Sequence, residues 1–192
     1  MGLPNDTLSS TPIQGFYLYP DNQETENLLD YEHGGIAIGD ASSGSQFQVW
    51  TLTYVDPNVI LTPENAGPTT VLSIAGLKEA SLSFDQNMNP TIAYVTSTDA
   101  AELWWFSTVD QTYLQTPLPA GSITPRVCLD DKRDLQSTAS DILLAYVRDD
   151  KLYYRYQRER YDNEYWLADL DAGQKLVKIG MSQQNRIQFW IL

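Results

Sequence analysis

Short hydrophobic and aromatic runs, separated by polar turns, dominate the chain from Phe16 onward. The runs are about four to eight residues long and are broken by clusters of Gly, Pro, Asn and Asp, which is typical of strands joined by turns. No segment has a convincing amphipathic helical period. The best candidate, residues 22–31, would form at most a short helical turn. The pattern therefore predicts an all-β fold.

The runs recur along the chain as a unit of four strands. The central run at residues 91–95 (TIAYV) is similar to runs at 143–147 (LLAYV) and 35–39 (GIAIG). A run ending in an acidic turn precedes each central run, and two further runs follow it. The preceding runs are 17–22, 82–87 and 127–131, and the following pairs are 47–52 with 59–61, 103–106 with 113–114, and 152–156 with 165–167. Three four-stranded units are therefore predicted.

A partial fourth copy ends the chain, because residues 177–182 and 186–190 repeat only the first two strands. Repeats of roughly 40 to 55 residues with four strands each are typical of propeller blades. About three and a half units are too few for an ordinary closed propeller. We therefore expect repeated four-stranded antiparallel sheets, propeller-blade-like, that stack, pack as a sandwich, or complete a ring with other copies of the chain. Each arrangement leaves sheet edges that need covering.

Residues 1–15 are rich in Thr, Ser, Pro and Asn and lack a periodic hydrophobic pattern. Such a segment is expected to be an extended N-terminal arm that lies on another surface. The remaining residues, 16–192, have enough hydrophobic content for one buried core. The sequence thus predicts an arm at 1–15 and a single all-β repeat domain at 16–192.

Charge and composition exclude several classes of partner. The formal net charge of -13 predicts repulsion from nucleic acid, so no nucleic-acid partner is expected. No hydrophobic run is long enough for a membrane span, and the N-terminus lacks the features of a signal peptide, so no membrane partner and no secretory route are expected. The single cysteine, Cys128, excludes an intrachain disulfide and multi-cysteine zinc sites.

The titratable residues do not form a recognisable catalytic or metal motif. The only histidine, His33, has no Gly-x-Ser-x-Gly partner motif, and Cys128 lies on an apparently buried strand. Asp21, Asp85 and Asp130 recur at the same place in each unit, which favours turn formation over catalysis. Residues 130–134 lack the ligand spacing of a calcium loop. We therefore expect no enzyme activity, no catalytic residues, no cofactor and no metal, with a paired-carboxylate hydrolase as a remaining rival.

Residues 151–161 (KLYYRYQRERY) interleave aromatic and basic side chains in an otherwise acidic protein. On a strand, alternate residues point to opposite faces, so one face would carry Leu152, Tyr154 and Tyr156 and the other Tyr153, Arg155 and Gln157. The stretch could bind a partner or stack on sugars, or it could be an ordinary twisted strand. The candidate interface residues are Tyr153, Tyr154, Arg155, Tyr156, Arg158, Arg160, Trp104 and Trp105.

Several of these runs resemble an uncharacterised family of bacteriophage virion proteins. The resemblance is carried by residues 84–95 and 140–148, and extends to 15–22, 29–37, 152–155, 157–160, 179–181 and 186–189. It implies a phage structural protein associated with the tail, with no catalytic residues to carry over.

The leading hypothesis is a tail-associated structural component of a bacteriophage virion that assembles in multiple copies in the host cytoplasm. Its expected partners are other virion proteins and further copies of the same chain, as a homo-oligomer. Two alternatives stay open. One is a capsid decoration protein, and the other is a host-attachment module that binds a host surface glycan by stacking it on Trp104, Trp105, Tyr153 or Tyr154.

Overall fold

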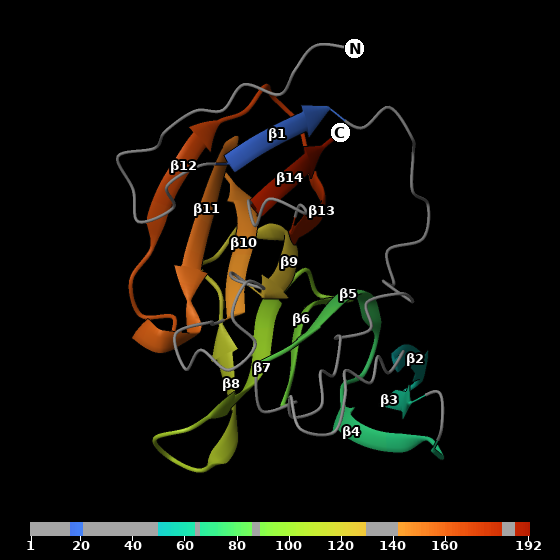
Figure 1. Ribbon diagram of the computed structural model, residues 1–192. Coiled ribbons are helices and arrows are strands. Elements are labelled where there is room, and N and C mark those ends of the chain that lie inside the picture. Colours follow the sequence, from blue (N-terminus) through green and yellow to red (C-terminus); the bar gives the residue numbers. More distant parts are fainter. Residues whose placement is uncertain (1–15, 21–49, 64–65, 86–88, 130–141, 182–186) are drawn as a thin grey trace.

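The computed structural model describes residues 16–20, 50–63, 66–85, 89–129, 142–181 and 187–192. These residues form fourteen strands and one short 3-10 helix, and the strands are arranged in four sheets (Figure 1). The predicted all-β fold of repeated sheets is therefore confirmed. The N-terminal arm, the weak helical candidate at 22–31 and His33 lie outside the described residues. Among the residues that are described, no helix is long and hydrophobic enough to cross a bilayer.

Two of the four sheets contain four antiparallel strands that follow one another in the sequence. The second sheet consists of β5 (Leu77–Phe84), β6 (Pro90–Thr96), β7 (Ala101–Ser107) and β8 (Thr112–Pro117). The third sheet consists of β9 (Ile123–Leu129), β10 (Ile142–Arg148), β11 (Lys151–Tyr156) and β12 (Tyr165–Asp169). These sheets match the second and third predicted units strand by strand.

The first and fourth sheets each contain three described strands. The first sheet consists of β2 (Trp50–Val55), β3 (Asn58–Pro63) and β4 (Thr69–Ser73), in that order. The fourth sheet consists of β13 (Leu176–Met181) and β14 (Ile187–Ile191), completed by β1 (Phe16–Pro20) from the other end of the chain.

The predicted composition of the first unit was wrong in two respects. The run that was assigned to its first strand is β1, which instead pairs in parallel with β14, from Phe16 opposite Ile187 to Pro20 opposite Ile191. Strand β4 was not predicted, because its pattern of exposed and half-buried positions carries little periodic signal. A repeat pattern assigns runs that are close in the sequence to the same sheet, whereas β1 pairs with β14, which is remote in the sequence. The run at 35–39 lies outside the described residues.

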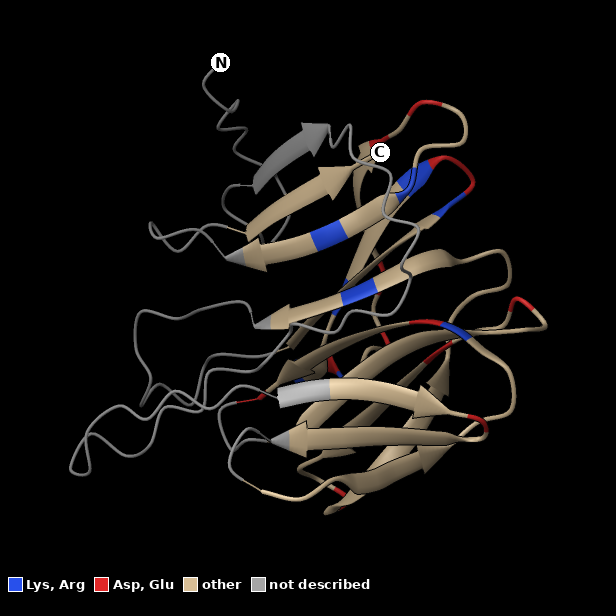
Figure 2. Cartoon of the chain, turned by 90° about the vertical axis from the view of Figure 1, so that its right-hand side faces the viewer, with Lys and Arg blue, Asp and Glu red and all other residues tan. Residues whose placement is uncertain are grey.

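The sheets pack face to face in the order first, second, third, fourth, with a hydrophobic core in each of the three spaces between them. Strand β10 illustrates why one sheet contributes to two cores. Its alternate side chains Leu143, Ala145 and Val147 contact the fourth sheet, whereas Ile142, Leu144 and Tyr146 contact the second. In the side view, the fourth sheet lies at the top and the first at the bottom (Figure 2). This layering agrees with the predicted stack of blade-like sheets.

Edge strands of successive sheets pack in a row, with β9 between β5 and β13. Each is an edge strand of its sheet, so the backbone groups on its outer side have no ladder partner among the described strands. Side chains of the neighbouring strand replace that partner: Ser81 Oγ accepts a hydrogen bond from Val127 N at 3.1 Å, and Thr124 Oγ1 accepts one from Leu176 N, also at 3.1 Å. Hydroxyl groups thus join the second sheet to the third and the third to the fourth.

A buried ion pair reinforces the same row of edge strands. Arg126 on β9 donates from Nη1 to Glu79 Oε2 on β5 at 3.0 Å, and both side chains are 8% exposed. Its Nε donates to the carbonyl oxygen of Val177 on β13 at 2.7 Å. One arginine therefore connects three sheets. Removing it would leave a buried carboxylate without a cation.

A bulge in β9 places Thr124 at this junction. The register between β9 and β10 shifts between Ala145 and Val147, opposite Thr124 and Pro125. Thr124 has a φ of 48°, in the left-handed region that β-branched residues rarely adopt. Its hydroxyl group bonds the backbone of Leu176, so the unusual conformation coincides with a contact between two sheets.

Candidate functional site: an arginine and tyrosine cluster on the third sheet

The structure separates the aromatic and basic residues of β11 by face. Leu152 and Tyr154 are fully buried and Tyr156 is nearly so, whereas Tyr153 and Arg155 are half-buried. This alternation confirms the two expected faces for residues 151–156, whereas Gln157 does not continue the strand but begins a short 3-10 helix. The buried face packs against the fourth sheet, and the other face is directed toward the second.

Four of the eight candidate interface residues are core residues. Tyr154 and Tyr156 lie in the core between the third and fourth sheets. Trp105 lies between the second and third sheets and donates from Nε1 to Thr116 Oγ1 at 2.9 Å. Trp104 is 8% exposed and stacks on Tyr113, with ring centroids 4.0 Å apart. Sequence reasoning could not separate these residues from surface residues, because aromatic side chains are enriched in cores and interfaces alike.

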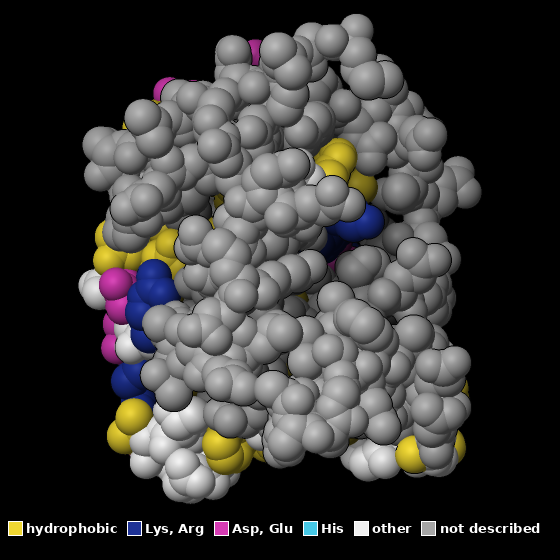
Figure 3. Space-filling view, viewed as in Figure 1, with side chains coloured by type: hydrophobic (Ala, Val, Ile, Leu, Met, Phe, Trp, Pro, Cys, Tyr) yellow, Lys and Arg dark blue, Asp and Glu magenta, His cyan; other side chains and the backbone are white. Residues whose placement is uncertain are grey.

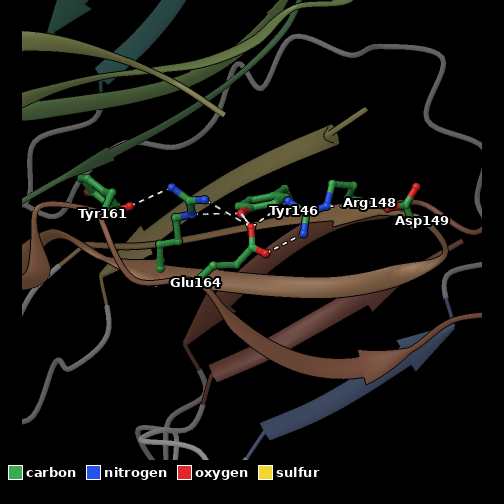
Figure 4. A network of polar contacts seen from close by, with 6 residues as sticks. Tyr146, Arg148, Asp149, Tyr161 and Glu164 are labelled. Atoms are coloured by element: carbon green, nitrogen blue, oxygen red, sulfur yellow. Dashed lines mark hydrogen bonds and ion pairs between the residues drawn. The ribbon is translucent and has the colours of Figure 1, made fainter. Parts of the chain in front are cut away.

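The face of the third sheet that is directed toward the second sheet carries a connected network of polar contacts (Figure 4). We call it the Arg–Tyr cluster, and it consists of Tyr146, Arg148, Tyr153, Arg155 and Glu164. Glu164, just before β12, is its centre. Arg148 binds both carboxylate oxygens of Glu164, with Nη1 2.9 Å from Oε2 and Nη2 2.6 Å from Oε1. Arg155 Nη2 donates to Glu164 Oε2 at 3.2 Å, and the Tyr146 hydroxyl donates to the same oxygen.

The other two nitrogen atoms of Arg155 also donate hydrogen bonds within the chain. Its Nε donates to the Tyr146 hydroxyl oxygen at 2.9 Å and its Nη1 to the backbone oxygen of Tyr161 at 2.8 Å. The Arg148 guanidinium carbon lies 4.6 Å from the centre of the Tyr153 ring, a cation–π geometry. Arg155 was a candidate interface residue, and the structure places it in contacts that fix the segment between β11 and β12.

The surroundings of Glu164 in the Arg–Tyr cluster favour its charged form. Burial alone would raise the pKa of Glu164, but hydrogen bonds from Arg148, Tyr146 and Arg155 outweigh it and lower that pKa below its usual value. Burial, together with the hydrogen bond to Glu164, raises the pKa of Tyr146. The hydrogen bond to Glu164 raises the pKa of Arg148. Glu164 is therefore an anion held between two cations and a neutral phenol at neutral pH.

The short 3-10 helix η1 (Gln157–Glu159) carries or adjoins the other two candidate arginines. Arg158 lies over the Tyr156 ring, 3.8 Å from its centroid. Arg160, which ends η1 in the left-handed conformation, donates from Nη2 to Asp110 Oδ2 at 2.8 Å in the turn between β7 and β8. Hydrogen bonds from Ser107 and Arg160 lower the pKa of Asp110. Basic side chains lie beside acidic ones at the left margin of the space-filling view (Figure 3).

The sequence did not predict a role for two residues in or beside the Arg–Tyr cluster, Glu164 and Trp166. Glu164 was not singled out, because its partners Arg148 and Arg155 meet it only when three strands are in register. Trp166 was treated only as part of a strand, although it is 51% exposed. It is opposite Tyr153 in the β11–β12 ladder. The alternation of β12 could have indicated its exposure, because the following residue, Leu167, is buried.

The carboxylates that were considered for catalysis have structural contacts where they are described. Asp85 directly follows β5 and accepts hydrogen bonds from the backbone N and the Nδ2 of Asn89, as expected for a turn residue. Asp21 and Asp130 lie outside the described residues. Cys128 is buried in the core between the third and fourth sheets, as predicted. Within the described ranges, no three His, Cys, Asp or Glu side chains lie close enough together to hold a metal ion.

Comparison with known proteins gives no family for this chain. No family model matches its sequence, and no curated protein is similar to it at a significant level.

Proposed function

We propose that the chain is a tail-associated structural component of a bacteriophage virion that assembles in multiple copies. The sequence resemblance suggests the virion, and the stack of sheets supports a structural role. The observation that carries the structural role is that three arginines form ion pairs within the chain. Arg126, Arg148 and Arg155 each bind a carboxylate of the same chain, and Arg126 does so between two sheets. These side chains stabilise a compact layered body, as a particle component outside the cell requires.

A glycan-binding module for host attachment is the second candidate. A sugar ring stacks on an exposed aromatic face, and three of the four aromatic residues considered for this role, Trp104, Trp105 and Tyr154, are buried. The exposed Trp166 opposite the half-buried Tyr153 is the observation that favours this candidate. The guanidinium of Arg148 covers part of the Tyr153 ring, which reduces the surface available to a sugar.

Proteomic analysis of purified particles tests the proposed function. Particles of the phage that encodes the chain are purified on a density gradient and separated into tails and capsids, and the chain is quantified by mass spectrometry. We expect it in the tail fraction in several copies per particle. Presence in the capsid fraction would favour a decoration protein, and absence from both fractions would refute a virion role.

A ligand screen separates the glycan-binding candidate from the structural one. Saturation-transfer NMR with host surface polysaccharide is recorded on the wild type and on a Trp166→Ala variant. A structural component gives no saturation transfer to the sugar with either protein. A signal from the wild type that the variant loses would make glycan binding the better account.

A further inference from the structure

Strand β1 differs from every other described strand in how it is held. It pairs in parallel, whereas the other ladders of the described residues are antiparallel and join strands that are consecutive in the sequence. Its partner β14 lies at the opposite end of the chain, so that Phe16 is level with Ile187. The fourth sheet is therefore completed by a segment that is remote from it in sequence (Figure 1).

The contacts of β1 are concentrated on a single neighbour. Among the described elements it packs extensively only against β14, through five register pairs. Strands β13 and β14 have a second attachment, because five of their side chains enter the core shared with the third sheet: Leu176, Ile179, Ile187, Phe189 and Ile191. The five register pairs between β1 and β14 are lost when β1 detaches, whereas the core side chains of β13 and β14 still connect the fourth sheet to the third.

From this topology we propose that β14 is an acceptor edge for strand exchange, in which β1 of one copy pairs with β14 of another copy. The proposal rests on the multi-copy assembly of the proposed function and names the contact between copies. A bare β14 would present unpaired backbone N–H and C=O groups, which sheets normally cover. A second copy carries the same β1 sequence and can form the same ladder with the same register.

Exchange changes the connectivity of the ladder and leaves its hydrogen bonds unchanged. The difference in free energy therefore lies mainly in chain entropy and in the local concentration of the donor strand. Within one copy, residues 21–49 tether β1 to the rest of the chain, and the same tether holds it when it pairs with a neighbour. In an assembly, a neighbouring copy supplies β1 at a local concentration well above that of free chains in solution.

Connectivity also allows the donor to reach a neighbour. Residues 21–49 link β1 to β2, and a chain of this length spans up to roughly 100 Å when extended. Each copy has one donor strand and one acceptor edge. Head-to-tail exchange therefore builds a ring in which each copy gives and receives one strand, whereas reciprocal exchange builds a dimer.

Cysteine cross-linking between copies tests the exchange. In a Cys128→Ala background, Tyr17→Cys and Gln188→Cys place thiols at register partners on β1 and β14. Chains that carry both substitutions should cross-link within the chain after refolding at high dilution. The two single variants are then mixed, unfolded and refolded together at high concentration. We expect covalent dimers that include about half of the chains if exchange is complete and pairing is random.

A third variant controls for chance encounters. Lys178 lies on β13, beyond β14, and is level with Trp190. Two strand spacings of roughly 5 Å each then separate it from β1, beyond the reach of a disulfide. Tyr17→Cys mixed with Lys178→Cys should therefore give only background dimer. The proposal is overturned if the Tyr17→Cys and Gln188→Cys mixture also stays at background while the double variant cross-links within one chain, or if the double variant does not cross-link at all. Covalent dimers from a chain that is absent from particles would refute the virion role and leave the exchange standing.

Discussion

Replacing Arg126 by methionine should be severely destabilising, because one guanidinium group connects three sheets. The substitution retains a long hydrophobic side chain and removes the cation beside Glu79, whose side chain is only 8% exposed. It also removes the donor to Val177 O. Breaking a buried pair by removing one partner costs about 3 to 5 kcal/mol. Since a domain of this kind has a net stability of roughly 5 to 15 kcal/mol, Arg126→Met should lose a large part of it.

Urea denaturation followed by tryptophan fluorescence measures this loss. The matched control is Lys78→Ala, which removes the cation of the neighbouring but exposed Lys78–Asp99 pair, with side-chain exposures of 41% and 79%. Exposed pairs contribute about 0 to 1 kcal/mol, so the control should unfold near the wild-type midpoint. The double variant Glu79→Leu, Arg126→Met should recover most of the loss, because no buried charge remains unpaired. The reasoning is refuted if Arg126→Met is no more destabilising than Lys78→Ala.

Three further predictions concern the fourth sheet, the Arg–Tyr cluster and one turn. Truncation after Gly173 removes β13 and β14, and with them five core side chains that stabilise the fold by about 1.5 to 3 kcal/mol each. The shortened chain should therefore show no cooperative thermal transition by circular dichroism. A transition at the wild-type midpoint would contradict the placement of these strands in the core. Because the pKa of Glu164 is lowered by folding, the carboxylate contributes stability above its unfolded pKa of about 4.3, and this contribution is lost as pH falls through the folded value. Wild type should therefore exceed Glu164→Gln in urea-unfolding free energy at pH 7, by an amount that shrinks toward pH 3; a constant difference would count against the network. Gly76→Ala should destabilise more than Gly173→Ala, since both have positive φ but only at Gly76 would the added Cβ meet Ser97; equal melting temperatures would contradict this.

The sequence predicted the local architecture well, because each strand of the second and third sheets pairs with its neighbours in the chain. Alternation along β11 was visible in the letters KLYYRY, since the period of two is imposed by the backbone. The turn role of Asp85 was also predictable, because its hydrogen-bond partner Asn89 is local and lies four residues away.

Long-range pairing was not predictable from a repeat pattern. Nothing within residues 16–20 specifies β14 as a partner, and a parallel pair needs no local turn to set its register. The position of Glu164 has the same explanation, since β10 supplies Arg148 and β11 supplies Arg155. Buried and exposed aromatic residues were also indistinguishable by type. Trp104 lies in the core between the first and second sheets, whereas Trp166 is 51% exposed.

The location of the chain in an intact particle tests the central claim of this account most directly. A cryo-electron microscopy reconstruction of the phage that encodes it gives position, copy number and symmetry in one measurement. The account predicts four-layered β domains in the tail, in multiple copies with threefold, sixfold or twelvefold order. Density for the domain on the capsid lattice, or none at all in a complete particle, would contradict it.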